Sequence, residues 1–391
     1  MLFFIFPQKR KPKPRSLRHR IRAAYAGYLS PAALIAIWAA LIPYIRDELQ
    51  LDNLEVGRLL LCFGVGSIAG MLSAAPLTKQ LGSRMLCTLS FLAAAVIILA
   101  LSLLPPFVPT CMLAFLFGLT AGQLEVGINI YGVALEREYR LHLMAPLHAY
   151  YSAGELLSAA CMLVMLSLNL SPAAAALSLT VLIALCALYY FPCIVNFDFK
   201  GQKEKSFMLP TAGVAGLSLI VFATYMSGGA MVDWSGIYLT EHSPLSLKQA
   251  VLGYLLVSGC MLICRIYGNR LIRTFGSLKT AAGGALLLIA GLTLLYLTPP
   301  LYLIIPAFVL IGFGMSNITP LAYSAAGRQR EMPLLPAVSI MSTAGYGGLL
   351  TGPALLGFIA YGLSLEAVFG FLAVLTVMSF TLIVLLRRYY V

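Results

Sequence analysis

The placement of the basic residues constrains this chain more than any other feature. Of its 26 Lys and Arg residues, 22 fall in the N-terminal and C-terminal segments and in every second connection between twelve apolar stretches. Only 10% of the residues are charged and the mean hydropathy is +0.92, which is too apolar for a water-soluble fold. Because Lys and Arg gather on the cytoplasmic side of inserted helices, the pattern predicts a polytopic membrane protein with both termini in the cytoplasm.

A helix needs about 20 residues to cross a bilayer, and this length sets the expected organisation. We predict an all-α membrane protein whose twelve transmembrane helices lie at residues 23–45, 54–76, 85–105, 110–135, 141–168, 172–195, 209–240, 247–268, 280–298, 301–325, 333–361 and 366–386. A charged connection divides the helices into two sets of six. The predicted parts are a basic cytoplasmic tail (1–22), an N-terminal bundle (23–195), a cytoplasmic central loop (196–208), a C-terminal bundle (209–386) and a cytoplasmic C-terminus (387–391).

Composition and motifs argue against several other classes of protein. The net charge of +12 does not indicate nucleic-acid binding, because the basic residues lie at helix ends, where the orientation rule places them. The eight Cys residues show no CxxC and no Cys/His cluster of metal-binding spacing, so we expect neither a metal nor a cofactor. We expect no enzyme, since HExxH, Gly-x-Ser-x-Gly and nucleotide-binding loops are missing from the sequence.

The two halves of the chain repeat each other. Leu77–Ser83 corresponds to Leu271–Ser277 at an offset of 194 residues, and Ser152–Gly154 corresponds to Thr343–Gly345 at an offset of 191. A third short match, at the ends of the fourth and tenth predicted helices, has an offset of 193. Three matches in the same order at nearly one offset indicate two bundles related by duplication.

Polar residues at membrane depth are restricted to certain helices. The apolar spans of the third, sixth, ninth and twelfth predicted helices contain no charged residue, Asn, Gln or His, so we expect them to face lipid. The fourth, fifth, seventh and tenth helices carry the polar residues of membrane depth, which are Glu125, Asn129, His148, Glu155, Asp233 and Asn317. Buried ionisable groups are costly in a membrane and often functional, so these helices are expected to line the interior.

The helix pattern resembles the major facilitator superfamily over essentially the whole chain. Within that superfamily, Gly118–Asn129 is similar to the fucose and proton symporter group. The stretches His148–Gly154 and Asp233–Ser235 resemble a bacterial branch of inner-membrane permeases that includes a rhizopine-related membrane protein of rhizobia. The resemblance implies a multi-pass protein of the bacterial inner membrane that binds a small solute, uses protons and works as a monomer. Symporters of the fucose type also carry an acid in the first helix, which this chain lacks.

The resemblance also implies a gating turn on the cytoplasmic side after the second and eighth helices. The superfamily normally has an acidic residue followed by basic ones there, but Lys79 and Arg273 occupy the corresponding places in this chain. The expected gating set keeps the pattern's glycines and basic residues, together with an Arg near the cytoplasmic end of the eighth helix: Gly82, Arg84, Arg265, Gly268 and Gly276.

Three acids are candidates for proton coupling, namely Glu125, Glu155 and Asp233. Glu125 lies ~21 Å into its helix at ~1.5 Å per residue, and an unpartnered carboxylate at that depth is costly. Counting inward along the antiparallel fifth helix places Glu155 level with Glu125, and His148 level with Asn129. An alternative interpretation of each residue is an interhelical hydrogen bond with no role in transport.

Neutral hydrogen bonders and aromatic rings are the candidates for solute contact. The expected set is Asn129, His148, Trp38, Tyr225, Asn317 and Tyr346. Gly228 and Gly229 follow Tyr225 and are expected to interrupt the seventh helix. The tenth helix has no acid at the place of Glu125, so the proton and solute contacts are expected to divide between the bundles.

We therefore expect a proton-coupled permease that moves a small polar or sugar-like solute by rocking the two bundles. Two alternatives remain open at this point. The first is a transporter of amphipathic compounds or a siderophore, which would need a wide and mostly apolar cavity. The second is a membrane solute sensor that has the same fold but does not transport.

Overall fold

The computed structural model describes residues 16–51, 53–103, 105–197, 209–242, 251–298 and 300–390. The tail before residue 16, residues 198–208 of the predicted central loop and Val391 lie outside this range. The first half of the chain forms six long helices, α1 (Leu17–Glu48), α2 (Asn53–Leu81), α3 (Ser83–Ser102), α4 (Phe107–Tyr139), α5 (Met144–Ser167) and α6 (Pro172–Tyr190), followed by the 3₁₀ turn η1 (Phe191–Cys193).

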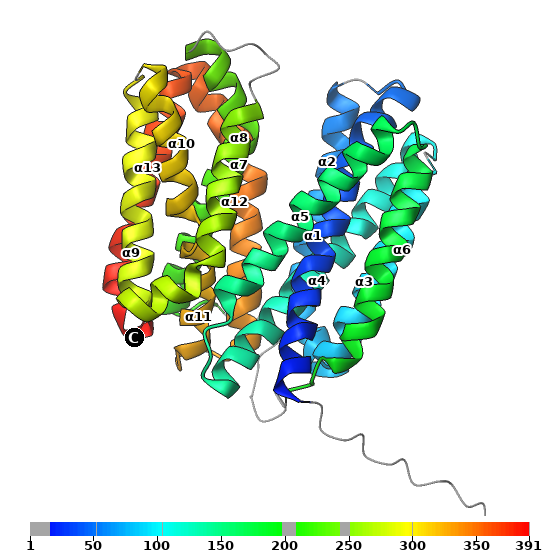
Figure 1. The fold of residues 1–391 in the computed structure, drawn as a ribbon, viewed down its shortest axis with the longest axis horizontal. Helices are drawn as coiled ribbons and strands as arrows, with labels where there is room; N and C mark the ends of the chain where they lie inside the picture. The colour runs from blue at the N-terminus through cyan, green and yellow to red at the C-terminus, as the bar shows by residue number, and fades with distance from the viewer. Residues whose placement is uncertain are drawn as a thin grey trace, which may run out of the picture.

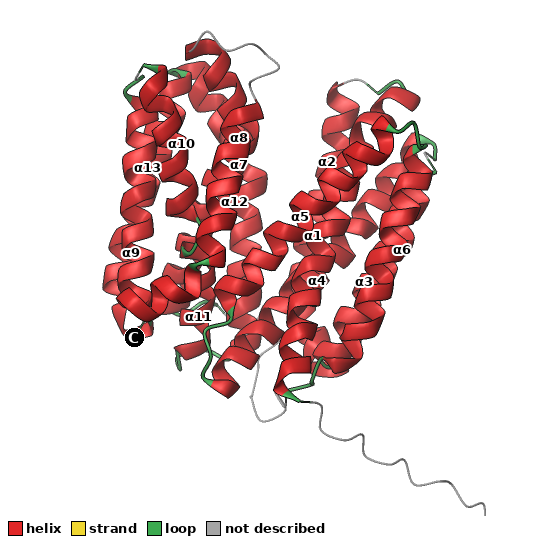
Figure 2. Ribbon diagram, in the orientation of Figure 1, coloured by secondary structure: helices red, strands yellow, loops and turns green. Residues whose placement is uncertain are grey.

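The second half is also helical. Its elements are α7 (Ala212–His242), α8 (Val251–Ile266), α9 (Gly268–Tyr296), α10 (Leu301–Met315), α11 (Ile318–Arg328), α12 (Leu334–Gly362), α13 (Leu365–Leu385) and the 3₁₀ turn η3 (Arg387–Tyr389). Within the described residues, eleven helical segments are long and apolar enough to cross a membrane, and a shorter apolar one, Leu255–Ile266, lies in α8. Figure 2 shows only helices and loops, which confirms the predicted all-α fold.

Apart from shifts of a few residues at other helix ends, two differences from the predicted helices bear on the interior of the protein. The predicted span 301–325 is broken at Ser316 and Asn317, so that it forms α10 and α11. The predicted eighth helix ends at residue 268, but helical backbone continues along α9 to a kink at Gly276, where φ is +79°. Hydropathy cannot detect this continuation, because the added turns carry Arg270 and Arg273 at a membrane surface.

The kink supports the internal repeat. Gly276 has φ 79° and ψ 161°, and Gly82, its counterpart before α3, has φ 81° and ψ 155°. Positive φ is costly for a residue with a side chain, which accounts for glycine at both places. Each glycine turns the chain between two antiparallel helices of the same bundle.

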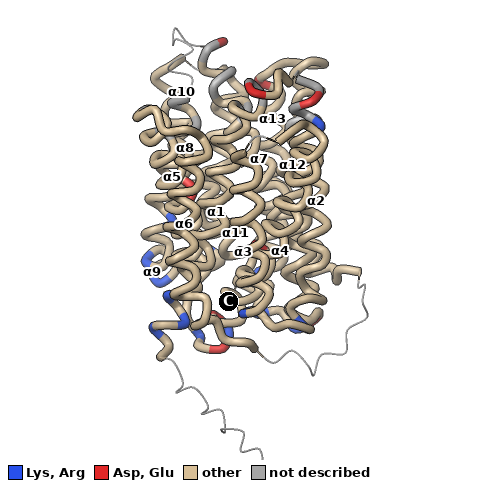
Figure 3. The backbone as a smooth tube through the Cα atoms, turned by 90° about the vertical axis from the view of Figure 1, so that its right-hand side faces the viewer, with Lys and Arg blue, Asp and Glu red and all other residues tan. Residues whose placement is uncertain are grey.

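The two bundles stand side by side (Figure 1). In the first, α2 packs on α4 and α1 on α5; in the second, α7 packs on α12 and α9 on α10 and α13. The end of the molecule that carries the start of α1 and the end of α13 is called the terminal face below. Figure 3 shows most of the drawn Lys and Arg residues at this end.

Contacts between the bundles gather toward the terminal face. The Ser339 hydroxyl on α12 donates to the Met71 carbonyl on α2 at 2.7 Å. A Cβ on Gly327 would lie 2.5 Å from Val133, and a Cβ on Gly268 would lie 2.8 Å from the Cβ of Ala145. Toward the opposite face the ribbons diverge (Figure 1). The described conformation is therefore closed at the terminal face.

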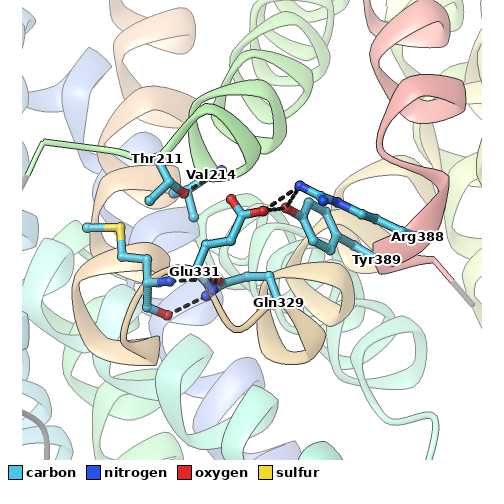
Figure 4. Close-up of polar contacts among 7 residues, drawn as sticks. Thr211, Val214, Gln329, Glu331, Arg388 and Tyr389 are labelled. Carbon is cyan, nitrogen blue, oxygen red and sulfur yellow. Dashed lines mark hydrogen bonds and ion pairs between the residues drawn. The ribbon is translucent and has the colours of Figure 1, made fainter.

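A polar cluster at the terminal face joins the connection between α11 and α12 to the 3₁₀ turn η3 (Figure 4). Glu331, in the connection between α11 and α12, accepts hydrogen bonds from the Tyr389 hydroxyl and from Arg388. The Tyr389 hydroxyl, and then the charge of Arg388, hold the pKa of Glu331 below its ordinary value. Gln329 accepts from the backbone N–H groups of Glu331 and Met332 at 2.7 and 2.8 Å, which fixes the turn into α12.

Candidate functional site

A cavity of about 260 Å³ lies between the two bundles. Its wall is contributed by α1, α2, α4 and α5 from the first bundle and by α7, α8, α10, α11 and α12 from the second. The residues that line it are Ile35, Phe63, Glu125, His148, Tyr151, Glu155, Thr224, Tyr225, Gly228, Gly229, Met261, Arg265, Met315, Thr319, Tyr346 and Leu349. None of these belongs to α3, α6, α9 or α13, in agreement with the expectation that these four helices lie away from the interior.

Glu125 on α4 is held by one hydrogen bond and leaves one oxygen free. Its Oε1 accepts from the side-chain amide of Asn129 at 3.0 Å, and its Oε2 has no hydrogen-bond partner in the described structure. Asn129 in turn accepts from the Tyr28 hydroxyl at 2.7 Å. Asn129 is fully buried and does not line the cavity, so the structure places it behind Glu125.

His148 and Glu155 lie two helical turns apart on α5 and both line the cavity. The His148 ring lies edge-on to Tyr28, with centroids 5.3 Å apart, and is stacked near Tyr323 at 6.0 Å. Its Nε2 is buried without a hydrogen-bond partner among the described residues. The first bundle therefore brings two carboxyl groups and an imidazole to one cavity wall.

The second bundle supplies aromatic rings and hydroxyl groups to the cavity. Tyr225 on α7 and Tyr346 on α12 have ring centroids 5.9 Å apart, and Thr319 on α11 has a buried hydroxyl with no described partner. Gly228 and Gly229 also line the cavity, but α7 continues through them as a regular helix. The expected interruption of the seventh helix is therefore wrong.

Arg265 lies in the last turn of α8 and also lines the cavity. Its Nε donates to the Ser316 carbonyl at 3.0 Å, and its Nη1 donates to the Ser152 hydroxyl of the first bundle at 2.5 Å. The bounds of α8 agree with the expected place near the end of the eighth helix, but helical backbone continues through α9 to Gly276, so that Arg265 lies at the cavity and not at the terminal face. This side chain is the cation of the cavity wall.

Three other candidate residues are not on this wall. Trp38 is buried against Phe63 and Phe117, with centroids 5.9 Å away in both cases. Asn317 lies at the break between α10 and α11, and its amide nitrogen is 3.4 Å from the Cys264 sulfur. Asp233 lies in α7, but its side chain is outside the described ones.

The remaining gating candidates lie at the terminal face. Arg84 donates through Nε to the Ile194 carbonyl at 2.8 Å, and its backbone N–H donates to Asn196 at 2.9 Å. Gly82 lies against the same Asn196, because a Cβ there would come within 2.6 Å of it. Gly82 and Arg84 thus contact the end of their own bundle, whereas Gly268 lies directly against Ala145 of the other bundle.

Several wall residues were not among the sequence candidates. Tyr151 is one turn from His148 and one turn from Glu155, so the spacing along α5 already carried a signal for it. Thr319 lies two residues after Asn317, in the first turn of α11. The break between α10 and α11 leaves Asn317 off the cavity wall and places Thr319 on it. Phe63, Met261 and Met315 carry no sequence signal, since apolar residues in a membrane helix are the rule.

The sequence of this chain is similar to those of known membrane proteins. Residues 24–331 match the family model of the Major Facilitator Superfamily. An uncharacterized MFS-type transporter of Yersinia pestis is 32% identical over 87% of this chain and 89% of its own length. The membrane protein MosC of Rhizobium meliloti is 28% identical over 85% of this chain and 81% of its own.

Solved structures show the same fold. FucP in the outward conformation superposes with a TM-score of 0.77 and 15% identity, covering 95% of this chain and 99% of FucP. A second structure, of a variant of the same E. coli fucose:proton symporter, has a TM-score of 0.75 and 16% identity over 95% and 99% of the two chains.

Proposed function

The chain belongs to the Major Facilitator Superfamily, and from this premise we propose that it is a proton-coupled transporter of a small polar or sugar-like solute. The solute binds in the cavity between the bundles, and rocking of the bundles exposes that cavity to each side of the membrane in turn. The protein acts as a monomer in the bacterial inner membrane with both termini in the cytoplasm. The basic residues at the terminal face support this orientation.

One observation carries the proposal: Glu125 has a carboxyl oxygen with no partner at the wall of the cavity. Burying a carboxylate at membrane depth is costly unless a cation or several hydrogen bonds compensate it. Among the described residues, Oε1 of Glu125 has an Asn129 hydrogen bond and no cation lies within ion-pair distance of either oxygen. A carboxyl group so placed is suited to take up and release a proton as access to water changes.

The size and lining of the cavity support a small solute. A space of about 260 Å³ with carboxyl, imidazole, hydroxyl and guanidinium groups on its wall suits a small solute that forms many hydrogen bonds. The groups on the wall are also divided between the bundles, as expected if one bundle carries the proton and the other contacts the solute. The acids and His148 come from the first bundle, whereas Tyr225, Tyr346 and Thr319 come from the second. The fucose:proton symporter with the same fold supports sugar-like solutes as the first class to test.

Replacement of Glu125 by Gln tests the proton assignment. The amide keeps the size and the hydrogen-bonding capacity of the side chain but cannot exchange a proton. In proteoliposomes, Glu125→Gln is expected to keep solute binding and counterflow exchange and to lose accumulation driven by a pH gradient. Glu331→Gln removes an acid of the terminal face outside the cavity and is the matched control, which should still accumulate solute. Full gradient-driven accumulation by Glu125→Gln would refute the assignment, and binding without counterflow in the wild type would favour a sensor.

A further inference from the structure

Arg265 is oriented by two hydrogen bonds that leave part of its guanidinium group available. Nε is used by the Ser316 carbonyl and one N–H of Nη1 by the Ser152 hydroxyl. A guanidinium group has five N–H donors, so the edge formed by Nη1 and Nη2 retains donors with no described partner. Arg265 is partly exposed and lines the cavity, so this edge is within reach of a solute.

No described carboxylate lies within ion-pair distance of Arg265, although Glu155 on the same cavity wall is near enough to interact with its charge. Among the described residues, the ion pairs with a separation of 4.0 Å or less are His242 with Glu366 and Arg388 with Glu331, and neither lies at the cavity. Glu125 is hydrogen-bonded to Asn129, and Glu155 lies on the cavity wall without reaching ion-pair distance. A cation at membrane depth that lacks a paired anion is costly to keep, and a binding role would account for that cost.

The internal repeat argues that the fold itself does not need this cation. At the offset of 194 residues, Arg265 corresponds to Met71 on α2. Both positions contact the opposite bundle, since the Met71 carbonyl accepts from Ser339 on α12 and the Arg265 side chain donates to Ser152 on α5. The interface of α2 with α12 therefore forms with the apolar Met71 at the position that Arg265 occupies in the interface of α8 with α5. A charged residue at the other is best explained by something that it binds.

We propose that Arg265 binds the carboxylate of the transported solute, and that this solute is a small hydroxylated monocarboxylate such as a sugar acid. This inference rests on the transport function proposed above. A carboxylate pairs with two parallel N–H groups of a guanidinium edge, and the free edge at Nη1 and Nη2 provides them. A single cation balances a single negative charge, whereas a dianion would be left with excess charge beside Glu125 and Glu155. The hydroxyl groups of the solute then face Thr319, Tyr225 and Tyr346.

The test compares acids with neutral molecules of the same skeleton. Binding of D-glucuronate against D-glucose, D-galacturonate against D-galactose and D-gluconate against D-sorbitol is measured by calorimetry on the full chain in lipid nanodiscs. We expect at least one acid to bind about tenfold or more tightly than its neutral partner, as a charge-assisted pair requires. If no acid is preferred over its partner, the proposal is wrong.

Variants assign that preference to Arg265. Arg265→Met introduces the residue of the equivalent position in the first bundle and should abolish the preference, whereas Arg265→Lys keeps the charge and should retain part of it. Ser339→Ala, which removes the hydrogen bond of the equivalent interface, is the matched control and should keep the full preference. If folded Arg265→Met or Arg265→Gln still preferred the acid, Arg265 would not be its ligand.

The outcomes separate this inference from the proposed function. A neutral sugar accumulated by a pH gradient, with equal affinity in wild type and Arg265→Met, would overturn the inference and leave proton-coupled transport in place. If an acid is bound through Arg265, and Glu125→Gln accumulates this acid as fully as the wild type does under a pH gradient, the inference is supported and the proton assignment is refuted.

Discussion

At the scale of single residues, the wall of the cavity could be predicted only in part. Glu125, His148, Glu155, Tyr225 and Tyr346 were candidates from sequence and all line the cavity. Polarity at membrane depth identifies such residues, because a buried polar group needs a reason to be there. The rotation of each helix about its axis is not encoded in polarity alone. Asn129 and Trp38 were therefore expected on the wall but are covered by neighbouring side chains.

The position of Asn129 leads to a prediction about stability. Its side chain accepts from Tyr28 and donates to Glu125, so Asn129→Ala leaves a buried carboxyl oxygen of Glu125 without a partner and the buried Tyr28 hydroxyl with only the Met144 sulfur, 3.7 Å away. We expect a loss of about 1–2 kcal/mol in the free energy of unfolding, measured by denaturant or thermal unfolding in detergent. Tyr28→Phe removes one of these two hydrogen bonds without a large cavity and should cost less. Wild-type stability of Asn129→Ala would contradict this assignment.

At the scale of elements, sequence predicted helix number and repeat better than helix ends. The match of Gly82 with Gly276 was visible as a short repeated string, and the two glycines have nearly equal backbone angles. The break at Ser316 and the continuation beyond residue 268 were not predicted. Both depend on hydrogen bonds and contacts that neighbouring helices offer to the backbone, and hydropathy carries no information about these. Because of this continuation, Arg265, although in the last turn of α8, lies at the cavity.

The contact between α2 and α4 gives a prediction at this scale. Gly66 and Gly70 on α2 alternate with Gly118 and Gly122 on α4, and a Cβ at Gly118 would lie 2.1 Å from the Phe63 carbonyl oxygen. Small residues four apart allow such close packing of membrane helices.

Gly118→Ala must therefore push the two helices apart, and overpacking of this kind costs about 1–3 kcal/mol. The matched control is Gly259→Ala on α8, where nothing lies within 4 Å of the added Cβ and helix propensity improves. Thermal unfolding of the two purified variants should show a lower midpoint for Gly118→Ala only. Equal midpoints would show that α2 and α4 do not pack as described.

At the scale of the whole molecule, the family and the two-bundle architecture could be recognised from sequence, but the conformational state could not. The length of each membrane helix is set by the thickness of the bilayer, and the placement of basic residues follows from the orientation of the helices in it. Both can therefore be read from sequence. Which face is closed depends on small differences between two packings of the same helices. Here the contacts of Met71 with Ser339 and of Val133 with Gly327 close the terminal face.

This closure predicts the effect of a covalent bridge between the bundles. Cysteines introduced at Met71 and Ser339, joined by a short thiol-reactive cross-linker, should hold the terminal face closed. Because alternating access requires this face to open, cross-linked protein should lose solute counterflow while it still binds solute from the opposite side. Reduction of a cleavable cross-linker should restore counterflow, and the wild type treated with the same reagent controls for its eight native cysteines. Counterflow at the wild-type rate in fully cross-linked protein would mean that these contacts do not belong to a gate, and that α2 and α12 move together during transport.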